Sequence, residues 1–401
     1  MKKITFSSWP SHSKEEIEAV SQVLSSNKTN YWNGDQVKQF EREFADFSNT
    51  KHAVALSNGT VALEVALNAI DIQIGDEVIV ASRTYLASAS SIVNVGGIPI
   101  FCDVDRDTQV ITAKNILSKL SKKTKAIICV HLAGWPCDMD PIIEIAKNNN
   151  ILVIEDCAQA HGAKYKGKSV GSFGSIGCWS FCQDKIISTG GEGGMVTTND
   201  RNLWSRMWSL KDHGKDWMAV NSNSSKVFKL VHHSFGSNFR MTEMQAAIGR
   251  IQLKNMPKWN KSRRKNAEKI WEFAKNIKHI RVPYLTCDLC SKLEMDEVMC
   301  KHNIHAAYKC YIFVEGTKEQ RDRIVSSINE KGVPCFSGSC SEVYLEKSFQ
   351  DANLAPTERL PIAKELGDTS LMFLCHPTIT DIELENTLLA LEISVKECFH
   401  D

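Results

Sequence analysis

The chain has 401 residues, of which 43% are hydrophobic and 24% charged, and its formal net charge at pH 7 is +1. This length can bury a large core and suggests two or three domains, while the balanced charge gives no electrostatic footprint for nucleic acid. The sequence has no stretch of about eighteen consecutive apolar residues, and polar residues rather than an apolar leader follow Lys2 and Lys3. We therefore expect a cytoplasmic protein with neither a membrane nor a nucleic-acid partner.

The chain contains fourteen cysteines. In a chain of this size without a signal peptide, we interpret them as reduced thiols rather than as a disulfide framework. A zinc site is the alternative for one group, although its two histidines are only three residues apart, closer than is usual in zinc fingers. The candidate ligands are Cys287, Cys290, Cys300, His302, His305 and Cys310.

Two amphipathic helices are predicted at the start of the chain. Ser13 and Glu16 form a capping box ahead of an apolar repeat that begins at Ile17. Apolar residues recur at helical spacing again from Val37 to Phe47.

Predicted strands then alternate with predicted helices of about ten residues. This alternation indicates an α/β fold with a mainly parallel sheet that is covered by helices on both faces. The predicted strands are residues 53–56, 78–81, 98–104, 126–131, 151–155, 178–181 and 195–198. The predicted helices follow Thr60, Tyr85, Thr112, Asp140 and Asp200.

Residues 162–169 match the pattern of a phosphate-binding P-loop, G-x-x-x-x-G-K-S. Such a loop must open directly into a helix, but residues 170–177 contain three glycines and do not favour one. We therefore prefer the interpretation that the match is accidental to that of a nucleotide hydrolase.

The last third of the chain is predicted to form a separate unit. Thr242 favours the start of a helix that ends near Leu253, and Pro257 with the basic run at 261–265 suggests a domain boundary. We expect a large catalytic domain at residues 1–256 and a smaller α+β domain at residues 257–401. The basic run is interpreted as a solvated helix face. Within the smaller domain, the patterns predict a strand at 306–314, a helix at 318–331 and a loop at 334–341.

Two charged residues follow predicted strands in a way that suggests chemistry. Asp156 ends the apolar strand that begins at Ile151, and Lys185 follows the strand at 178–181 on a turn that leads into a glycine-rich run. Open α/β sheets bind ligands at the carboxyl ends of their strands. A carboxylate and a lysine at neighbouring strand ends are the two groups that pyridoxal phosphate requires, for its ring nitrogen and its aldehyde. A helix cap or a surface ion pair is the alternative explanation for either residue alone.

Together with the segments 57–60 and 236–241, these residues make the chain resemble the DegT/StrS family of sugar aminotransferases. The resemblance runs in order from about Ser57 to Arg250 and is weaker in the tail. It implies the type I fold of pyridoxal-phosphate enzymes, a homodimer with shared active sites, and transfer of an amino group from L-glutamate to a keto sugar. The product would be an amino sugar for a surface polysaccharide.

The resemblance also implies roles for individual residues. Lys185 would form the covalent link to pyridoxal 5'-phosphate and move protons, and Asp156 would keep the ring nitrogen protonated. Tyr85 would stack on the ring, and Gln159 would touch the phenolic oxygen or face the sugar. The phosphate would be held by Gly59, Thr60 and Ser180 of one subunit and by Asn238 of the other.

The chain departs from the family pattern at Gly190-Gly191, which places an additional glycine between Lys185 and Glu192. Glu192 is therefore left outside the predicted catalytic set. Other acceptors within the family are free keto sugar acids, such as an oxidised octulosonate, and cyclitols. A sugar dehydratase of the same family would carry histidine in place of Lys185, and a non-catalytic regulator would not need the complete lysine and aspartate pair.

Overall fold

The computed structural model describes residues 5–221, 230–286, 302–338 and 342–400. Two helices open it, as the sequence predicts: α1 (Lys14–Ser25) begins in a capping box between Ser13 and Glu16, and α2 (Gln36–Phe47) buries Phe40 and Phe44. Both helices pack against the long helix α9 (Glu243–Ala274).

A seven-stranded sheet forms the centre of the molecule, with the strand order β1-β9-β8-β5-β4-β2-β3. All neighbouring strands pair in parallel except β9, which is antiparallel to both β1 and β8. The strands are β1 (His52–Leu56), β2 (Glu77–Ala81), β3 (Ile98–Cys102), β4 (Thr124–Val130), β5 (Leu152–Asp156), β8 (Ile176–Ser180) and β9 (Gly194–Thr198). The prediction of a mainly parallel sheet is confirmed.

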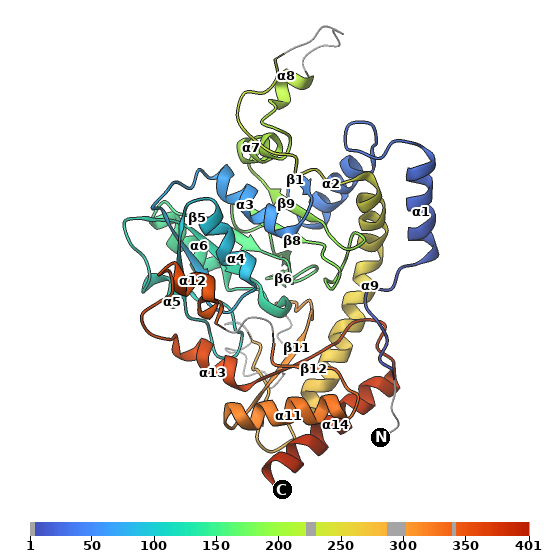
Figure 1. Cartoon of the computed structure of the whole chain (residues 1–401), viewed down its shortest axis with the longest axis vertical. Helices are drawn as coiled ribbons and strands as arrows, with labels where there is room; N and C mark the ends of the chain where they lie inside the picture. The colour runs from blue at the N-terminus through green and yellow to red at the C-terminus, as the bar shows by residue number, and fades with distance from the viewer. Residues whose placement is uncertain (1–4, 222–229, 287–301, 339–341, 401) are drawn as a thin grey trace.

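Helices connect the strands and cover the sheet (Figure 1). Every residue of β8 and β9 is buried, so both faces of the sheet are covered at these strands, as is typical of parallel sheets. The connecting elements are α3 (Gly59–Ala69), α4 (Leu86–Asn94), α5 (Ala113–Leu117), η1 (Leu132–Gly134), α6 (Met139–Asn148), α7 (Arg201–Lys211) and α8 (Trp217–Asn221).

A second, antiparallel sheet lies in the C-terminal part of the chain, with the strand order β10-β11-β13-β12. Its presence agrees with the predicted α+β character of this region. The elements are β10 (Ile280–Arg281), β11 (Cys310–Val314), α11 (Lys318–Glu330), β12 (Cys335–Phe336), η2 (Val343–Leu345), α12 (Lys347–Asp351), α13 (Pro361–Thr369), β13 (Ser370–Phe373) and α14 (Asp381–Phe399).

Helix α9 corrects the prediction that a helix ends near Leu253, because it continues through Pro257 to Ala274. A proline inside a helix costs about 3 kcal/mol. Here the N-terminal half packs against α1 and α2 while the C-terminal half contacts β11 and α14, so tertiary packing on both sides outweighs that cost. Figure 1 shows α9 running from the level of the large sheet to the C-terminal helices. The domain boundary at residues 256 and 257 therefore falls inside a continuous helix, and the division itself stays a prediction.

Three further expectations differ in detail. The basic run is not wholly solvated, because Arg263 is buried. The strand predicted from residue 306 begins only at Cys310, and the predicted loop at 334–341 contains the short strand β12.

The segment that matches the P-loop pattern is a β-hairpin. Strands β6 (Lys164–Tyr165) and β7 (Lys168–Ser169) pair in antiparallel fashion across the turn at Lys166 and Gly167. No helix follows directly, which confirms that the match is accidental. Separately, none of the helices in the described part of the chain is long and apolar enough to cross a membrane.

Candidate functional site

A cavity of about 670 Å³ lies where β5 and β8 end and α3 begins. Seven of the eight residues predicted from the sequence line it. They are Gly59, Thr60, Tyr85, Asp156, Gln159, Ser180 and Lys185. The eighth, Asn238, is exposed and does not line the cavity.

The N-terminus of α3 forms one wall of the cavity. The Asn58 side chain caps this helix by accepting a hydrogen bond from the Val61 N–H at 2.9 Å. The first backbone N–H groups of a helix and its dipole together favour an anion. A Cβ atom on Gly59 would lie 2.6 Å from the Ser180 Cβ, so only glycine allows the helix start to approach β8 this closely. The wall therefore fits a phosphate group.

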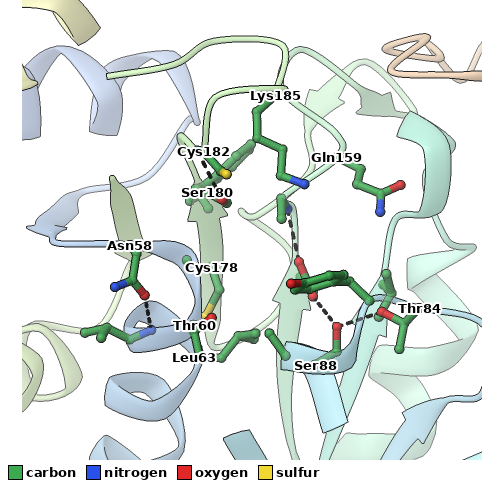
Figure 2. A pocket seen from close by; sticks show the side chains of 18 of the residues that line it. Asn58, Thr60, Leu63, Thr84, Ser88, Gln159, Cys178, Ser180, Cys182 and Lys185 are labelled. Atoms are coloured by element: carbon green, nitrogen blue, oxygen red, sulfur yellow. Dashed lines mark hydrogen bonds between the residues drawn. The ribbon is translucent and has the colours of Figure 1, made fainter. Parts of the chain in front are cut away.

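Asp156 ends β5 and is buried. Its Oδ2 accepts a hydrogen bond from the Ser88 hydroxyl at 2.6 Å, and its Oδ1 accepts one from the Ala158 N–H at 3.1 Å. Ser88 is in turn 2.7 Å from the Thr84 hydroxyl (Figure 2). These bonds hold the carboxylate in one orientation at the floor of the cavity. Thr84 and Ser88 were missed in the sequence: Ser88 lies in the first turn of α4, and Thr84 lies just before that helix.

Gln159 is buried at the cavity wall. Its Oε1 accepts a hydrogen bond from the Ala133 N–H at 2.8 Å, so its amide nitrogen is the group available as a donor toward the cavity. Figure 2 shows the Lys185 amine directed toward this side chain across the cavity. A ligand between them would meet one donor from each side.

Lys185 lies on the turn between β8 and β9, and its side chain is only 14% exposed. Its Nζ is 3.8 Å from Asp184 Oδ1 and 5.1 Å from the centroid of the Tyr308 ring. A carboxylate and an aromatic face both attract a lysine amine, so these two neighbours help to hold the Lys185 side chain in place.

Tyr308 comes from the C-terminal part of the chain, just before β11, and its hydroxyl donates a hydrogen bond to the Asp184 carboxylate. Burial and then Asp184 raise the pKa of the Tyr308 hydroxyl, which stays protonated as a donor. Burial alone would raise the pKa of Asp184, but Lys185 and the Tyr308 hydrogen bond outweigh it and lower that pKa. Tyr308 was missed because its contact with Asp184 joins residues 124 positions apart.

The fully buried carboxylate of Glu155 forms hydrogen bonds close to the ends of the strands. It accepts hydrogen bonds from the Gly171, Phe173 and Gly174 N–H groups and lies 3.0 Å from His131 Nε2. His131 Nδ1 accepts a hydrogen bond from the Cys137 N–H. His131, Glu155 and Cys157 lie within the spacing of a metal site, but these hydrogen bonds already use the imidazole and carboxylate, so the group is structural.

The suggested zinc ligands are not brought together in the described part of the chain. Cys287, Cys290 and Cys300 lie outside the described residues. His305 is buried beside the Trp135 and Trp271 rings, and its Nδ1 accepts a hydrogen bond from the Ala307 N–H at 2.7 Å.

A helix N-terminus with a glycine cradle, a fixed carboxylate at a strand end and a lysine amine facing the same cavity fit pyridoxal phosphate. Together with the mainly parallel sheet, they define a fold-type-I pyridoxal-phosphate-dependent aminotransferase. The chain belongs to the DegT/DnrJ/EryC1/StrS aminotransferase family, whose model matches residues 10–392.

Individual relatives agree with this assignment. The chain is 36% identical to a GDP-perosamine synthase of Caulobacter vibrioides over 365 residues, which cover 90% of each chain. It is 46% identical to a GDP-perosamine synthase of Escherichia coli O157:H7 over 244 residues, which cover 61% of this chain and 64% of that relative. The crystal structure of an aminotransferase from Psychrobacter cryohalolentis superposes with a TM-score of 0.92 at 52% identity, covering 99% of this chain and 100% of that one.

The anchored carboxylate generates a first prediction. Asp156→Asn should retain pyridoxal phosphate but lower the transamination rate by about two orders of magnitude, because a neutral amide does not hold the ring nitrogen protonated. Ser88→Ala should lower it less, since the carboxylate keeps its bond to Ala158. Single-turnover absorbance measurements with an amino acid donor check both variants.

Asp140→Asn is the matched control, because Asp140 is an exposed carboxylate paired only with Lys166. It should react like the wild type. If Asp156→Asn did the same, the assignment of Asp156 to the ring nitrogen would be wrong.

Proposed function

We propose that this aminotransferase transfers the amino group of L-glutamate to a keto sugar carried on a nucleotide, producing an amino sugar for a surface polysaccharide. The observation that carries the proposal is the single cavity in which the Lys185 amine, the anchored Asp156 carboxylate and the α3 N-terminus converge. The relatives named GDP-perosamine synthase make a GDP-linked keto sugar the first acceptor to test.

When bound, pyridoxal phosphate supplies an aldehyde that links to amines and a ring that accepts electrons. In the proposed mechanism, the α3 N-terminus and Ser180 hold the phosphate and Tyr85 packs on the ring. Asp156 keeps a proton on the ring nitrogen. Lys185 Nζ would take the proton from the amine-bearing carbon of the donor and deliver it to the former aldehyde carbon of the cofactor, and it would move a proton in the reverse direction for the acceptor, with Asp184 and Tyr308 beside it.

The alternatives within the family predict different activities. A free keto sugar acid or a cyclitol would be accepted without a nucleotide. A dehydratase would release water from the sugar without consuming an amino acid, and a regulator would bind the cofactor without turnover. Lys185 in the cavity favours transamination over the last two, because it supplies the amine that the proton transfer requires.

The oligomer is the second part of the proposal. We place the protein in the cytoplasm as a homodimer with shared active sites. The ten cysteines in the described part of the chain are all free thiols, which suits a reducing compartment. Asn238 is exposed and lies three residues after Phe235, which is 98% exposed, and helix α8 projects from the body of the molecule (Figure 1). An apolar side chain this exposed suits a surface that meets a second copy.

The acceptor is tested with the protein in its pyridoxamine form. A panel of GDP-, UDP- and dTDP-linked keto sugars, free keto sugar acids and cyclitols is added, and the return of the aldehyde absorbance is followed. We expect the nucleotide-linked sugars to react at least about tenfold faster than the free compounds. Reaction only with compounds that lack a nucleotide would reject the proposed acceptor class.

Borohydride tests the role of Lys185. Reduction of the protein loaded with pyridoxal phosphate should fix the cofactor to Lys185, and peptide mapping should find the label there. Lys185→Ala should show no label, whereas Lys309→Ala, which removes a neighbouring lysine that does not line the cavity, should be labelled normally. Label on another lysine in the wild type would contradict the proposed role.

Subunit exchange tests the shared site. If Asn238 contacts the phosphate in the neighbouring subunit, mixing Lys185→Ala with Asn238→Ala subunits should restore activity, because one hybrid site then contains both intact residues. About a quarter of the wild-type activity is expected from a statistical mixture with one repaired site per heterodimer. The test requires that Asn238→Ala alone be clearly impaired. Heterodimers that gain nothing over the parents would show that Asn238 serves its own chain.

A further inference from the structure

The backbone of Lys185 is held from both sides although it lies in no helix or strand. Its N–H donates a hydrogen bond to the Cys182 carbonyl at 3.0 Å. Its carbonyl accepts a hydrogen bond from the indole Nε1 of Trp9 at 2.7 Å. The first bond is local, whereas the second reaches across 176 positions of the sequence. A segment from the start of the chain therefore contacts the backbone of the lysine that faces the cavity.

Packing fixes the orientation of the Trp9 ring. It meets the Trp259 ring edge-on, with centroids 5.1 Å apart, and lies nearly parallel to the His376 ring at 6.2 Å. The guanidinium group of Arg263 lies 4.9 Å from the ring centroid, and its charge is buried. An indole N–H is only a donor, so its hydrogen bond must end on an acceptor, and these neighbours direct it to Lys185.

The two residues before Trp9 are tied to the C-terminal part of the chain. Ser7 donates hydrogen bonds from its N–H and its hydroxyl to the Glu383 carboxylate. The Ser8 carbonyl accepts a hydrogen bond from the Thr378 hydroxyl at 2.9 Å. We call residues 7–9 the N-terminal strap. It connects the beginning of α14 to the turn that bears Lys185.

The turn that bears Lys185 ends in two glycines. Gly190 and Gly191 follow Lys185 with φ angles of 84° and 123°, which allow this end of the turn conformations that other residues avoid. A Cβ atom on Gly191 would meet nothing within 4 Å, so the space beside this residue is open, and its N–H donates a hydrogen bond of 3.4 Å to the Ser188 hydroxyl. Besides Trp9, two distant residues contact the turn: the Tyr308 hydroxyl donates to Asp184, and Gln252 Oε1 accepts a hydrogen bond from the Ser188 N–H at 2.7 Å.

We propose that Trp9 is a positioning residue for Lys185: the N-terminal strap holds the Lys185 carbonyl so that the amine keeps its place in the cavity. This inference rests on the proposed role of Lys185 in amino transfer. A reacting group displaced by about 1 Å can lose roughly a hundredfold in rate, so a bond that fixes the backbone of the reacting lysine affects the chemical step more than substrate binding.

Trp9→Phe tests the proposal, because it removes the N–H donor and keeps an aromatic ring against Trp259, His376 and Arg263. Trp204→Phe is the matched control: it removes an indole N–H that donates to a backbone carbonyl elsewhere, that of Ala53, and leaves the ring cluster around Trp9 intact. Two quantities are measured in the full-length protein. The first is deuterium uptake by peptides that cover residues 183–189 in the absence of cofactor. The second is the L-glutamate half-reaction of the loaded enzyme, followed by cofactor absorbance.

We expect Trp9→Phe to increase deuterium uptake in this turn and to lower the limiting rate of the half-reaction roughly tenfold, with half-saturation by L-glutamate within about twofold of the wild type. Trp204→Phe should change neither. A merely structural role would lower the melting temperature of both variants without this division between rate and saturation. Equal uptake and equal rates for the two variants would overturn the proposal.

A second variant decides the matter if Trp9→Phe does not fold. Thr378→Val removes the hydroxyl that anchors Ser8 and leaves Trp9 in place, so it should raise uptake in the same turn and lower the same rate by a smaller factor. Unchanged uptake and rate in this variant would overturn the role of the strap. If the wild-type protein does not react with any amino acid, the proposed function is rejected. The deuterium-uptake measurement needs neither cofactor nor substrate, so it still tests the contact between Trp9 and Lys185.

Discussion

The parallel pairing of β5 with β8 is the constraint on which the site depends. Asp156 pairs in register with Cys178, so the carboxylate and the turn that follows β8 must lie at the same edge of the sheet. The connection between two parallel strands must run from the end of the first strand back to the opposite edge of the sheet, where the second strand starts. The carboxyl ends of β5 and β8 therefore lie at one edge, beside the cavity. Strand β1 is antiparallel to β9, and β9 is antiparallel to β8, so β1 and β8 run in the same direction. The start of α3, which follows β1, therefore lies at the same edge. The three parts of the site thus follow from one strand order.

Buried polar groups give this edge its rigidity. Glu155 is directed into the molecule, opposite to Asp156, and its charge is compensated by three backbone N–H groups and His131. A buried carboxylate without such partners would be strongly destabilising, so the turn at 171–174 must keep its conformation for the strand to remain in place. Adjacent residues in one strand therefore have different surroundings: Glu155 is bonded within the scaffold, and Asp156 faces the cavity.

The turn that bears Lys185 depends on distant parts of the chain. The N-terminal strap contacts the Lys185 carbonyl, Tyr308 bonds to Asp184, and Gln252 of α9 holds Ser188. These contacts hold the turn on several sides, although Lys185 itself lies in neither a helix nor a strand. The continuous helix α9 explains how they can act together, because it packs against the N-terminal helices, Trp9 and the C-terminal sheet at once.

The sequence alone determined the class of the fold and predicted which groups meet in the cavity, because these depend on local patterns: apolar strands, capping residues, and charged residues directly after strands. Asp156, Lys185 and the start of α3 were found in this way, and the family assignment is confirmed by the match over residues 10–392. The tertiary structure decided what local patterns do not contain. Pro257 lies within a helix because packing on both sides outweighs its intrinsic cost, and Arg263 is buried with its guanidinium group against the Trp9 ring. Ser88, Tyr308 and Trp9 reach the site through hydrogen bonds to residues 68, 124 and 176 positions away, and contacts of this kind are set by the packing of the whole chain rather than by any one segment.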